Sequence, residues 1–351
     1  MINTQKKTLG YRKLLPGDAP RDFRAEFARD VLEGLSAGQK RVPSAYLYDR
    51  RGSELFREIT MLDEYYPTKC EMGILDRHKA ELALVLPREK LDIVELGPGD
   101  GSKAAVLLDQ FLKDGLDFEY VPIDISEGAM VCLLDSCGRL GCGLRISGLV
   151  AEYSEALKWL ACKRMRRSLV LFLGSNIGNM GPATMRSFLR SLWNMLKDGD
   201  LLLIGFDLKK EISVIERAYN DSKGVTREFN LNLLDRINRE LGGDSSRENF
   251  EYHSRYSPQS GAVEGALVSR MGHEVNLRAL GKKFHFDAWE GIATEYSHKF
   301  LLPEIESLAA GTGFTVMKHL IDDKKYFVDS LWRVRKGLKK MESAMLHNKE
   351  K

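Results

Sequence analysis

The sequence predicts an α/β protein with a doubly wound, mostly parallel sheet into which a second lobe is inserted. Three features indicate this fold. Between about residues 91 and 208, short apolar runs alternate with amphipathic helical segments, as in a parallel sheet covered by helices. A glycine-rich turn follows the first run, and the alternation is lost between about residues 209 and 299. The chain has 351 residues, 43% of them hydrophobic, which exceeds the usual size of a single core.

Predicted strands and helices alternate as far as residue 208. In chain order, strand and helix in turn, they read LDIVELG, SKAAVLLDQFLKD, FEYVPIDIS, EGAMVCLLDSC, LRISGLVAEY, EALKWLACK, SLVLFLGS, ATMRSFLRSLWNML and DLLLIGFDL. The pattern of residues 211–241 then predicts two helices, and that of residues 249–280 predicts short strands in an antiparallel meander. A final helix and a strand hairpin are predicted from LLPEIESLAAGTG, FTVMKHLIDD and YFVDSLWRV.

The interruption of the alternating pattern divides the chain into two expected units. The sheet domain would comprise residues 70–208 and 300–335, and the second lobe residues 1–69 and 209–299. Residues 336–351 would form a charged tail. In sheets of this kind ligands bind beyond the carboxyl ends of the strands, so functional residues are expected there.

The composition argues against several classes of protein. A net charge of +3, from 53 basic and 50 acidic residues, is too balanced to predict a nucleic-acid partner. The 5 cysteines and 7 dispersed histidines match neither a disulfide framework nor a metal site. The N-terminus lacks the apolar core of a signal peptide, and no run is apolar enough for a membrane span. We therefore expect a cytoplasmic monomer without a metal, a membrane or a nucleic acid as partner.

The turn after the first predicted strand favours S-adenosylmethionine over a dinucleotide. It reads VELGPGDGS, in which Glu95 precedes Gly97, Gly99 and Gly101. Glycines at this point allow a ligand to approach the bare backbone. A dinucleotide fingerprint needs a further glycine where this chain has Ser102. The spacing E-x-G-x-G-x-G is instead the form seen in class I methyltransferases.

The next two predicted strands end in residues that suit a nucleoside. The strand YVPIDIS ends near Asp124, where a carboxylate can accept hydrogen bonds from both ribose hydroxyls. The third strand leads into Glu152 and Tyr153, which suit the edge and the face of an adenine. An acidic residue at a strand end is usually an ordinary turn residue. Three matches in register nevertheless predict a site for S-adenosylmethionine.

The stretch LYDRRGSELFREITMLDEYYPTKCE carries tyrosines on both sides of a predicted helix. Leu55 and Ile59 recur with the period of an amphipathic helix and are expected to pack. Tyr48, Tyr65 and Tyr66 flank this helix, where their hydroxyls either close off the core or face a ligand. This stretch alone leaves both readings open.

These motifs together resemble the histidine Nα-methyltransferase family of ergothioneine biosynthesis. The matching segments are YDRRGSELFREITMLDEYYPTKCE, ELGPGDGSK, VPIDIS, FLGSNIGNM, AYNDSKGVTREFNLNLLDRINRELGGD and TEYSHKF, and the resemblance covers about residues 40–335. It implies a class I methyltransferase fold with a second lobe that holds the amino acid. It also implies methylation of the α-amino group of L-histidine, up to the trimethylated betaine hercynine. The residues it implies for the cofactor site are Gly97, Lys103, Asp124, Glu152 and Tyr153.

The resemblance also implies how the amino acid is held. Asn179 and Tyr219 would bind its amino and carboxylate groups. Tyr65, Glu295 and Ser297 would address the imidazole, because a carboxylate can accept from one ring nitrogen while hydroxyls donate or accept at the other polar atoms.

Methyl transfer from a sulfonium is a direct displacement, which chiefly requires alignment of the reacting atoms. The amine must lose its proton first, and the resemblance implies that Tyr48 lies close enough to relay this proton through a water. Desolvation of the ammonium lowers its pKa in the same direction.

Some residues allow other interpretations or depart from the family pattern. Glu295 could form an ion pair with Lys299 one helical turn later, and Asn179 could be a helix cap. The family usually has methionine where this chain has Gly265, which should enlarge the amino-acid pocket. PGDGS replaces the usual SGTSE, and Asp63 replaces a common proline.

Three alternatives to histidine methylation therefore stay open. One is α-N-methylation of a bulkier aromatic amino acid or a modified histidine. Another is a non-catalytic binding protein on the same fold, which docks RNA through the basic runs KRMRRS and RVRKGLKK. A nicotinamide oxidoreductase is the third, and Ser102 argues against it.

Overall fold

The structure is a computed structural model, and it describes residues 9–14, 22–137, 144–163 and 166–337. The predicted tail from residue 338 onward lies outside the described residues, as do parts of the runs KRMRRS and RVRKGLKK. Among the helices of the described ranges, none is both long and apolar enough to cross a membrane.

Within the described residues, the largest sheet has eight strands in the order β1-β4-β3-β2-β5-β6-β13-β12. Their bounds are β1 (Leu9–Lys13), β2 (Leu91–Leu96), β3 (Phe118–Asp124), β4 (Ile146–Val150), β5 (Arg167–Phe172), β6 (Leu201–Asp207), β12 (Phe314–Ile321) and β13 (Phe327–Val334). Strands β1 to β6 pair in parallel, whereas β13 is antiparallel to both β6 and β12. The predicted doubly wound sheet is therefore confirmed.

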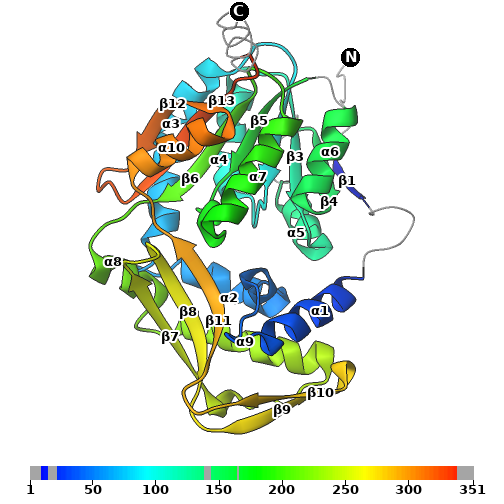
Figure 1. Ribbon diagram of the computed structural model, residues 1–351. Helices are drawn as coiled ribbons and strands as arrows, with labels where there is room; N and C mark the ends of the chain where they lie inside the picture. The colour runs from blue at the N-terminus through cyan, green and yellow to red at the C-terminus, as the bar shows by residue number, and fades with distance from the viewer. Residues whose placement is uncertain (1–8, 15–21, 138–143, 164–165, 338–351) are drawn as a thin grey trace, which may run out of the picture.

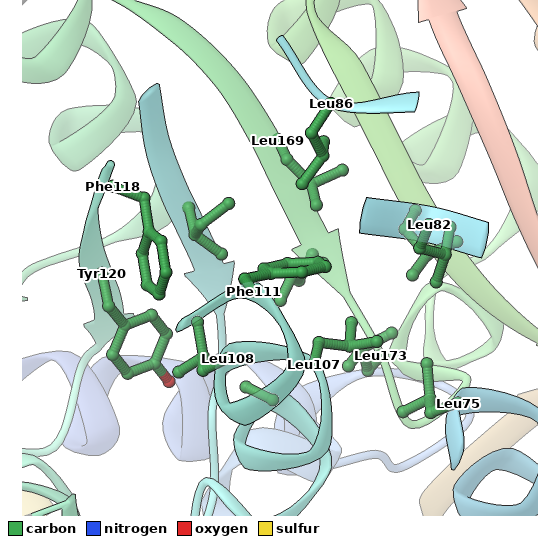
Figure 2. Packing of buried hydrophobic residues seen from close by; sticks show 14 of the residues in the cluster. Leu75, Leu82, Leu86, Leu107, Leu108, Phe111, Phe118, Tyr120, Leu169 and Leu173 are labelled. Carbon is green, nitrogen blue, oxygen red and sulfur yellow. The ribbon is translucent and has the colours of Figure 1, made fainter. Parts of the chain in front are cut away.

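Helices cover both faces of this sheet (Figure 1). One apolar core involves α3 (Tyr66–Val85), α4 (Ser102–Lys113) and α5 (Glu127–Cys137). The core on the opposite face involves α6 (Tyr153–Lys163), α7 (Pro182–Met195) and α10 (Leu302–Thr312). Figure 2 shows the first core, in which Phe111 of α4 lies among side chains such as Leu107, Leu169 and Leu173. Almost every strand side chain at the sheet centre is buried, which explains the continuous apolar runs of the sequence.

A second lobe lies next to the end of this domain at which the parallel strands finish (Figure 1). It contains α1 (Phe23–Ser36), α2 (Arg50–Thr60), α8 (Ile212–Tyr219), α9 (Val225–Leu241), β7 (Phe250–Ser257), β8 (Ala262–Ser269), β9 (His273–Leu277), β10 (Lys282–Phe286) and β11 (Gly291–His298). Strands β7, β8 and β11 form one antiparallel sheet in the order β11-β8-β7, and β9 pairs with β10. The N-terminal helices and the inserted segment share one core.

Two details differ from the sequence prediction. The meander ends after β8, because β9 turns away to pair with β10 and the third strand of the sheet is β11. Strand β1 was not predicted, because the short segment LGYRK has no apolar alternation. It pairs with β4, so residues 9–13 belong to the large sheet although the predicted boundary grouped residues 1–69 with the lobe.

The motif YDRRGSE forms the start of α2. Asp49 is the helix N-cap, and its carboxylate accepts a hydrogen bond of 2.7 Å from the backbone N–H of Gly52 and one of 2.8 Å from Asn232. A Cβ atom on Gly52 would lie 1.7 Å from the carbonyl oxygen of Leu47. Glycine is therefore required here to bring the segment before Tyr48 against the helix.

We predict that Gly52→Ala lowers the free energy of unfolding by about 1–3 kcal/mol, because the added methyl forces the backbone of Leu47 away. Gly73→Ala is the matched control, since Gly73 is also helical but exposed and without a neighbour within 4 Å of an added Cβ. That change should raise stability by roughly 0.5–1 kcal/mol. Denaturant unfolding of both variants measures the two signs, and a neutral Gly52→Ala would contradict the packing argument.

Candidate active site

The carboxyl ends of the parallel strands meet at the edge of the sheet that faces the second lobe (Figure 1). Strand β2 lies between β3 and β5, so the order of connection reverses beside it, which is where open α/β sheets bind ligands. Gly97 follows β2, Asp124 ends β3, and Glu152 and Tyr153 follow β4. The structure thus brings four of the five predicted cofactor residues to neighbouring strand ends.

The glycine-rich turn is shaped by close contacts. Gly97 has a φ of +67°, and a Cβ atom there would lie 2.5 Å from the hydroxyl of Tyr153. Gly99 also has a positive φ, of +58°, but no atom lies within 4 Å of an added Cβ, so its backbone is open to a ligand. Burial is the main reason why the pKa of Tyr153 is raised, and the nearby Asp124 adds to it. Tyr153 is therefore a neutral hydrogen-bonding group beside an accessible loop.

Asp124 carries the carboxylate expected to receive the ribose. One of its oxygens accepts a hydrogen bond of 2.8 Å from the backbone N–H of Ser126, which holds the side chain in place. Burial raises the pKa of Asp124, and backbone N–H groups partly offset this effect. The backbone carbonyl of Glu152 accepts from Ala156 at the start of α6. Both carboxylates thus lie at ordered strand-to-helix junctions.

Lys103 is held by a partner that the sequence analysis missed. Its ammonium lies 2.6 Å from Oε2 of Glu71, a fully buried residue of α3. The other oxygen of Glu71 accepts a hydrogen bond of 2.7 Å from the backbone N–H of Gly174, just after β5. A Cβ atom on Gly174 would lie 3.0 Å from the Lys103 ammonium. Lys103 therefore lies beside the end of β5, with its charge compensated by Glu71.

In the second lobe, the motif TEYSHK covers the last residues of β11 and the residue that follows it. Side chains alternate along a strand, so Glu295, Ser297 and Lys299 project on one side. The Lys299 ammonium donates to the hydroxyls of Tyr219 and Ser297, at 2.7 Å each, and lies 2.8 Å from Oδ2 of Asp207. Lys299 is fully buried and Asp207 nearly so. The suggested ion pair of Glu295 with Lys299 was wrong, because the segment is a strand and Lys299 binds Asp207.

Asp207 ends β6, so this ion pair joins the two units of the fold. The hydroxyl of Tyr66 donates to Asp207 at 2.8 Å, and Lys210 donates to Tyr66 at 2.7 Å and also pairs with Asp207. Burial by itself would raise the pKa of Asp207, but Lys299 and Lys210 outweigh it and lower that pKa. Tyr66 thus belongs to the junction, whereas the sequence had left its role open.

The ammonium of Lys299 fixes the direction of two hydroxyl groups. Tyr219 and Ser297 both accept from Lys299, and their oxygens are 2.8 Å apart. One hydroxyl hydrogen fills the bond between them, so the other is left to donate to a ligand. Burial raises the pKa of Tyr219, which keeps its hydroxyl protonated. The pair therefore presents a hydrogen-bond donor.

Glu295 presents the complementary acceptor. Its carboxylate oxygen Oε2 lies 3.4 Å from the hydroxyl of Tyr252. Burial raises the pKa of Glu295, and the charge of Lys299 opposes this. Gly265 is the cross-strand partner of Glu295, and a Cβ atom there would lie 3.0 Å from the Glu295 Cβ and 3.4 Å from the Tyr252 ring. The enlargement of the pocket expected at Gly265 stays a prediction, and the ring of Tyr252 lies in contact with the space that a Cβ atom at this position would take.

Tyr48 and Tyr65, the two tyrosines that flank α2, both lie near the carboxylate of Glu295. The ring of Tyr48 packs against Phe56 and Phe229, with centroids 5.2 and 5.3 Å apart, and Tyr65 lies 6.4 Å from the ring of Tyr219. Burial raises the pKa of both Tyr48 and Tyr65, and the nearby Glu295 contributes in each case. Neither phenol ionises near neutral pH, so both tyrosines are present as neutral hydroxyls and not as phenolates.

Asn179 ends the short 3-10 turn Asn176–Asn179 after β5, and its side chain is exposed. A Cβ atom on Gly178 would lie 2.8 Å from the carbonyl oxygen of His298, so this turn lies against the end of β11. Gly181, not Asn179, is the N-cap of α7. The structure thus brings Asn179 to the point where the sheet domain meets the strand that carries Glu295 and Ser297.

This combination of fold and site defines a class of protein. The parallel strands β4-β3-β2-β5-β6, with antiparallel β13 inserted before β12, and the acidic residue at the end of β3 are those of class I methyltransferases that use S-adenosylmethionine. More specifically, the chain belongs to the histidine-specific, S-adenosylmethionine-dependent methyltransferase family, whose sequence pattern matches residues 27–334.

Proteins of similar sequence support this membership. The histidine N-alpha-methyltransferase of Mycolicibacterium smegmatis is 38% identical over 78% of this chain and 84% of its own length. That of Mycobacterium tuberculosis is 36% identical over 86% of this chain and 93% of its own length. An L-tryptophan methyltransferase of Psilocybe serbica is 25% identical over 85% of this chain and 90% of its own length.

The sequence analysis missed Glu71, Asp207 and Tyr252, and it considered Lys299 only as a partner of Glu295. Only Lys299 carried a usable signal, since a lysine two positions after Ser297 continues the alternation of a strand. Glu71 lies within a helix, and Asp207 ends an apolar strand, where a carboxylate is also a common turn residue.

We predict that Lys299→Met destabilises the protein by about 3–5 kcal/mol, because it leaves Asp207 with one cation and removes the donor to Ser297. Lys318→Met is the control, since Lys318 forms an exposed ion pair with Glu81 and should contribute less than about 1 kcal/mol. Denaturant unfolding measures both changes. Equal and small losses would show that the buried pair is not the junction inferred above.

Proposed function

We propose that this protein transfers methyl groups from S-adenosylmethionine to the α-amino nitrogen of L-histidine, up to the trimethylated betaine hercynine. The observation that carries the proposal is the pairing of one acceptor, Glu295, with one fixed donor from Ser297 and Tyr219. A neutral imidazole has one N–H and one nitrogen lone pair, which is the complementary pattern. The names of the two mycobacterial relatives point to the same substrate.

The cofactor would lie along the strand ends of the sheet domain. The open backbone of Gly99 and the carboxylate at the end of β3 fit a nucleoside with an aliphatic, phosphate-free substituent. We assign ribose binding to Asp124, and contacts with the adenine to Glu152 and Tyr153. Gly97 would shape the loop, and the ammonium of Lys103, held in place by Glu71, would donate a hydrogen bond near the methionine carboxylate.

The amino acid would lie between this edge and β11. Asn179 and Tyr219 would hold its amino and carboxylate groups, and Tyr65 would join Glu295 and Ser297 around the imidazole. Gly265 would lie behind Glu295 as its strand partner.

Bound S-adenosylmethionine supplies an electrophilic methyl group, so the chain chiefly has to align the amine and to remove its proton. Tyr48, Tyr65, Phe56 and Phe229 form a cluster of rings, and an amine bound beside it would be partly desolvated, which lowers the cost of its deprotonation. Tyr48, whose raised pKa keeps it protonated, would pass the proton on through a water. The same aromatic faces can stabilise the cationic product.

Each part of the chain would have its own role. We propose that residues 70–208 and 300–335, together with β1, form the cofactor domain, and that most of residues 1–69 and 209–299 form the amino-acid lobe. We also propose that the protein acts as a cytoplasmic monomer on a free amino acid and without nucleic acid, and the balanced net charge of +3 supports the last of these points. A bulkier substrate is disfavoured by the ring of Tyr252 beside Gly265.

Incubation of the protein with S-adenosylmethionine and a pool of amino acids, followed by mass spectrometry, tests the proposal directly. We expect histidine to gain three methyl groups. Methylation of another amino acid would overturn the substrate assignment, and binding of RNA without any consumption of S-adenosylmethionine would favour the non-catalytic alternative.

We predict that Glu295→Gln lowers kcat/KM for histidine by about 10–100-fold at pH 8, mainly through KM, because a hydrogen bond to a carboxylate is lost. Burial raises the pKa of Glu295, so the native carboxylate is ionised above that pKa and becomes protonated as the pH falls through it. The penalty of the variant should therefore shrink toward acid pH. Both enzymes are expected to bind the neutral imidazole, so the titration of free histidine cancels in their ratio.

Glu264→Gln is the control, because Glu264 pairs with Tyr296 on the other side of the strands and hydrogen-bonds Ser260. It should leave the pH profile of kcat/KM unchanged. A penalty for Glu295→Gln that is constant across pH would contradict the role of the carboxylate.

A further inference from the structure

The space beside Gly265 is occupied by the tip of one tyrosine. Tyr252 lies on β7, opposite Leu267 in register and therefore diagonal to Gly265 on the same face of the sheet. An added Cβ on Gly265 would lie 3.4 Å from both Cε2 and the hydroxyl oxygen of Tyr252, and 3.0 Å from the Cβ of Glu295. A larger residue at position 265 and a tyrosine at position 252 thus compete for one volume.

The hydroxyl of Tyr252 also contacts two groups of the candidate site. It donates to the backbone carbonyl of Tyr219, at 3.2 Å, and lies 3.4 Å from Oε2 of Glu295. Ser254 donates to the same carbonyl at 3.1 Å, so β7 holds the end of α8 in place. Only 8% of Tyr252 is exposed, so its ring is a fixed wall rather than a mobile surface group.

We propose that Tyr252 is a specificity-determining residue, whose ring replaces a side chain at position 265 and limits the pocket beside Glu295 to a five-membered ring. The inference rests on the proposed function, since it concerns the amino-acid site of that reaction. It reverses the expectation that glycine at position 265 admits an indole. The selective side chain would thus lie on β7 and not on β8.

A reciprocal exchange tests this proposal. Tyr252→Ala should raise kcat/KM for L-tryptophan at least about tenfold relative to that for L-histidine, because the excluded volume becomes available. Gly265→Met alone should lower kcat/KM for histidine about tenfold or more, since its side chain meets Tyr252 and Glu295. The double variant should recover histidine preference to within about threefold of the native protein, because the methionine fills the vacated space.

Further variants separate specificity from folding. Tyr252→Leu replaces Tyr252→Ala if the latter does not fold, and a smaller shift in the same direction is expected. Tyr252→Phe keeps the ring, so selectivity should stay unchanged while KM for histidine rises through the loss of the hydrogen bond to the carbonyl of Tyr219. Tyr296→Leu is the control, because Tyr296 neighbours Glu295 on β11 but projects from the other face, and selectivity should not change.

Calorimetric binding of histidine and tryptophan in the presence of S-adenosylhomocysteine gives the same comparison without turnover. If the native protein methylates no amino acid, the proposed function fails. The binding preferences of the variants then still test whether the ring of Tyr252 limits the size of the bound side chain. Additive effects of the two substitutions, or an unchanged preference in both Tyr252→Ala and Tyr252→Leu, would overturn the role of Tyr252 even where histidine is methylated.

Discussion

The buried ion pair between Lys299 and Asp207 is the interaction on which the rest of the site depends. Removing two charges from water costs several kcal/mol for each ion, so such a pair persists only with further hydrogen bonds. Here Tyr66 and Lys210 complete the shell of Asp207, while Tyr219 and Ser297 complete that of Lys299. A single network therefore joins the sheet domain, α3, α8 and β11.

This network couples substrate geometry to cofactor geometry. The chain leaves β11 after His298 and reaches the end of β6 at Phe300, whose backbone N–H donates to the carbonyl of Asp207 at 2.9 Å. Glu295 and Ser297 are consequently fixed relative to the strand ends that would hold the cofactor. A direct displacement at a methyl group depends on such alignment more than on acid or base groups, because misplacement by about 1 Å can cost a hundredfold in rate.

Chemistry and selectivity are located in different places. In the proposed function, the strand ends after β2, β3 and β4 would serve any substrate of this reaction class, since they would contact only the cofactor. Selectivity would lie in the lobe, where Glu295 and the donor pair would recognise the hydrogen-bonding pattern of the ring and Tyr252 would limit its volume. A change of substrate would then require exchanges on β7 and β8, with the junction of Lys299 and Asp207 left intact.

The sequence by itself determined the class of fold, the cofactor and most of the candidate residues. Buried parallel strands must be apolar throughout, and turns such as the one at Gly97 need glycine, so both leave local signals. Strand β1 and the pairing of β9 left no such signal, because strand partners are chosen by contacts distant in the chain. Only the tertiary structure decided that Lys299 binds Asp207 and that Tyr252 fills the space at Gly265. Those contacts join residues from separate strands, and no local periodicity records which side chains meet.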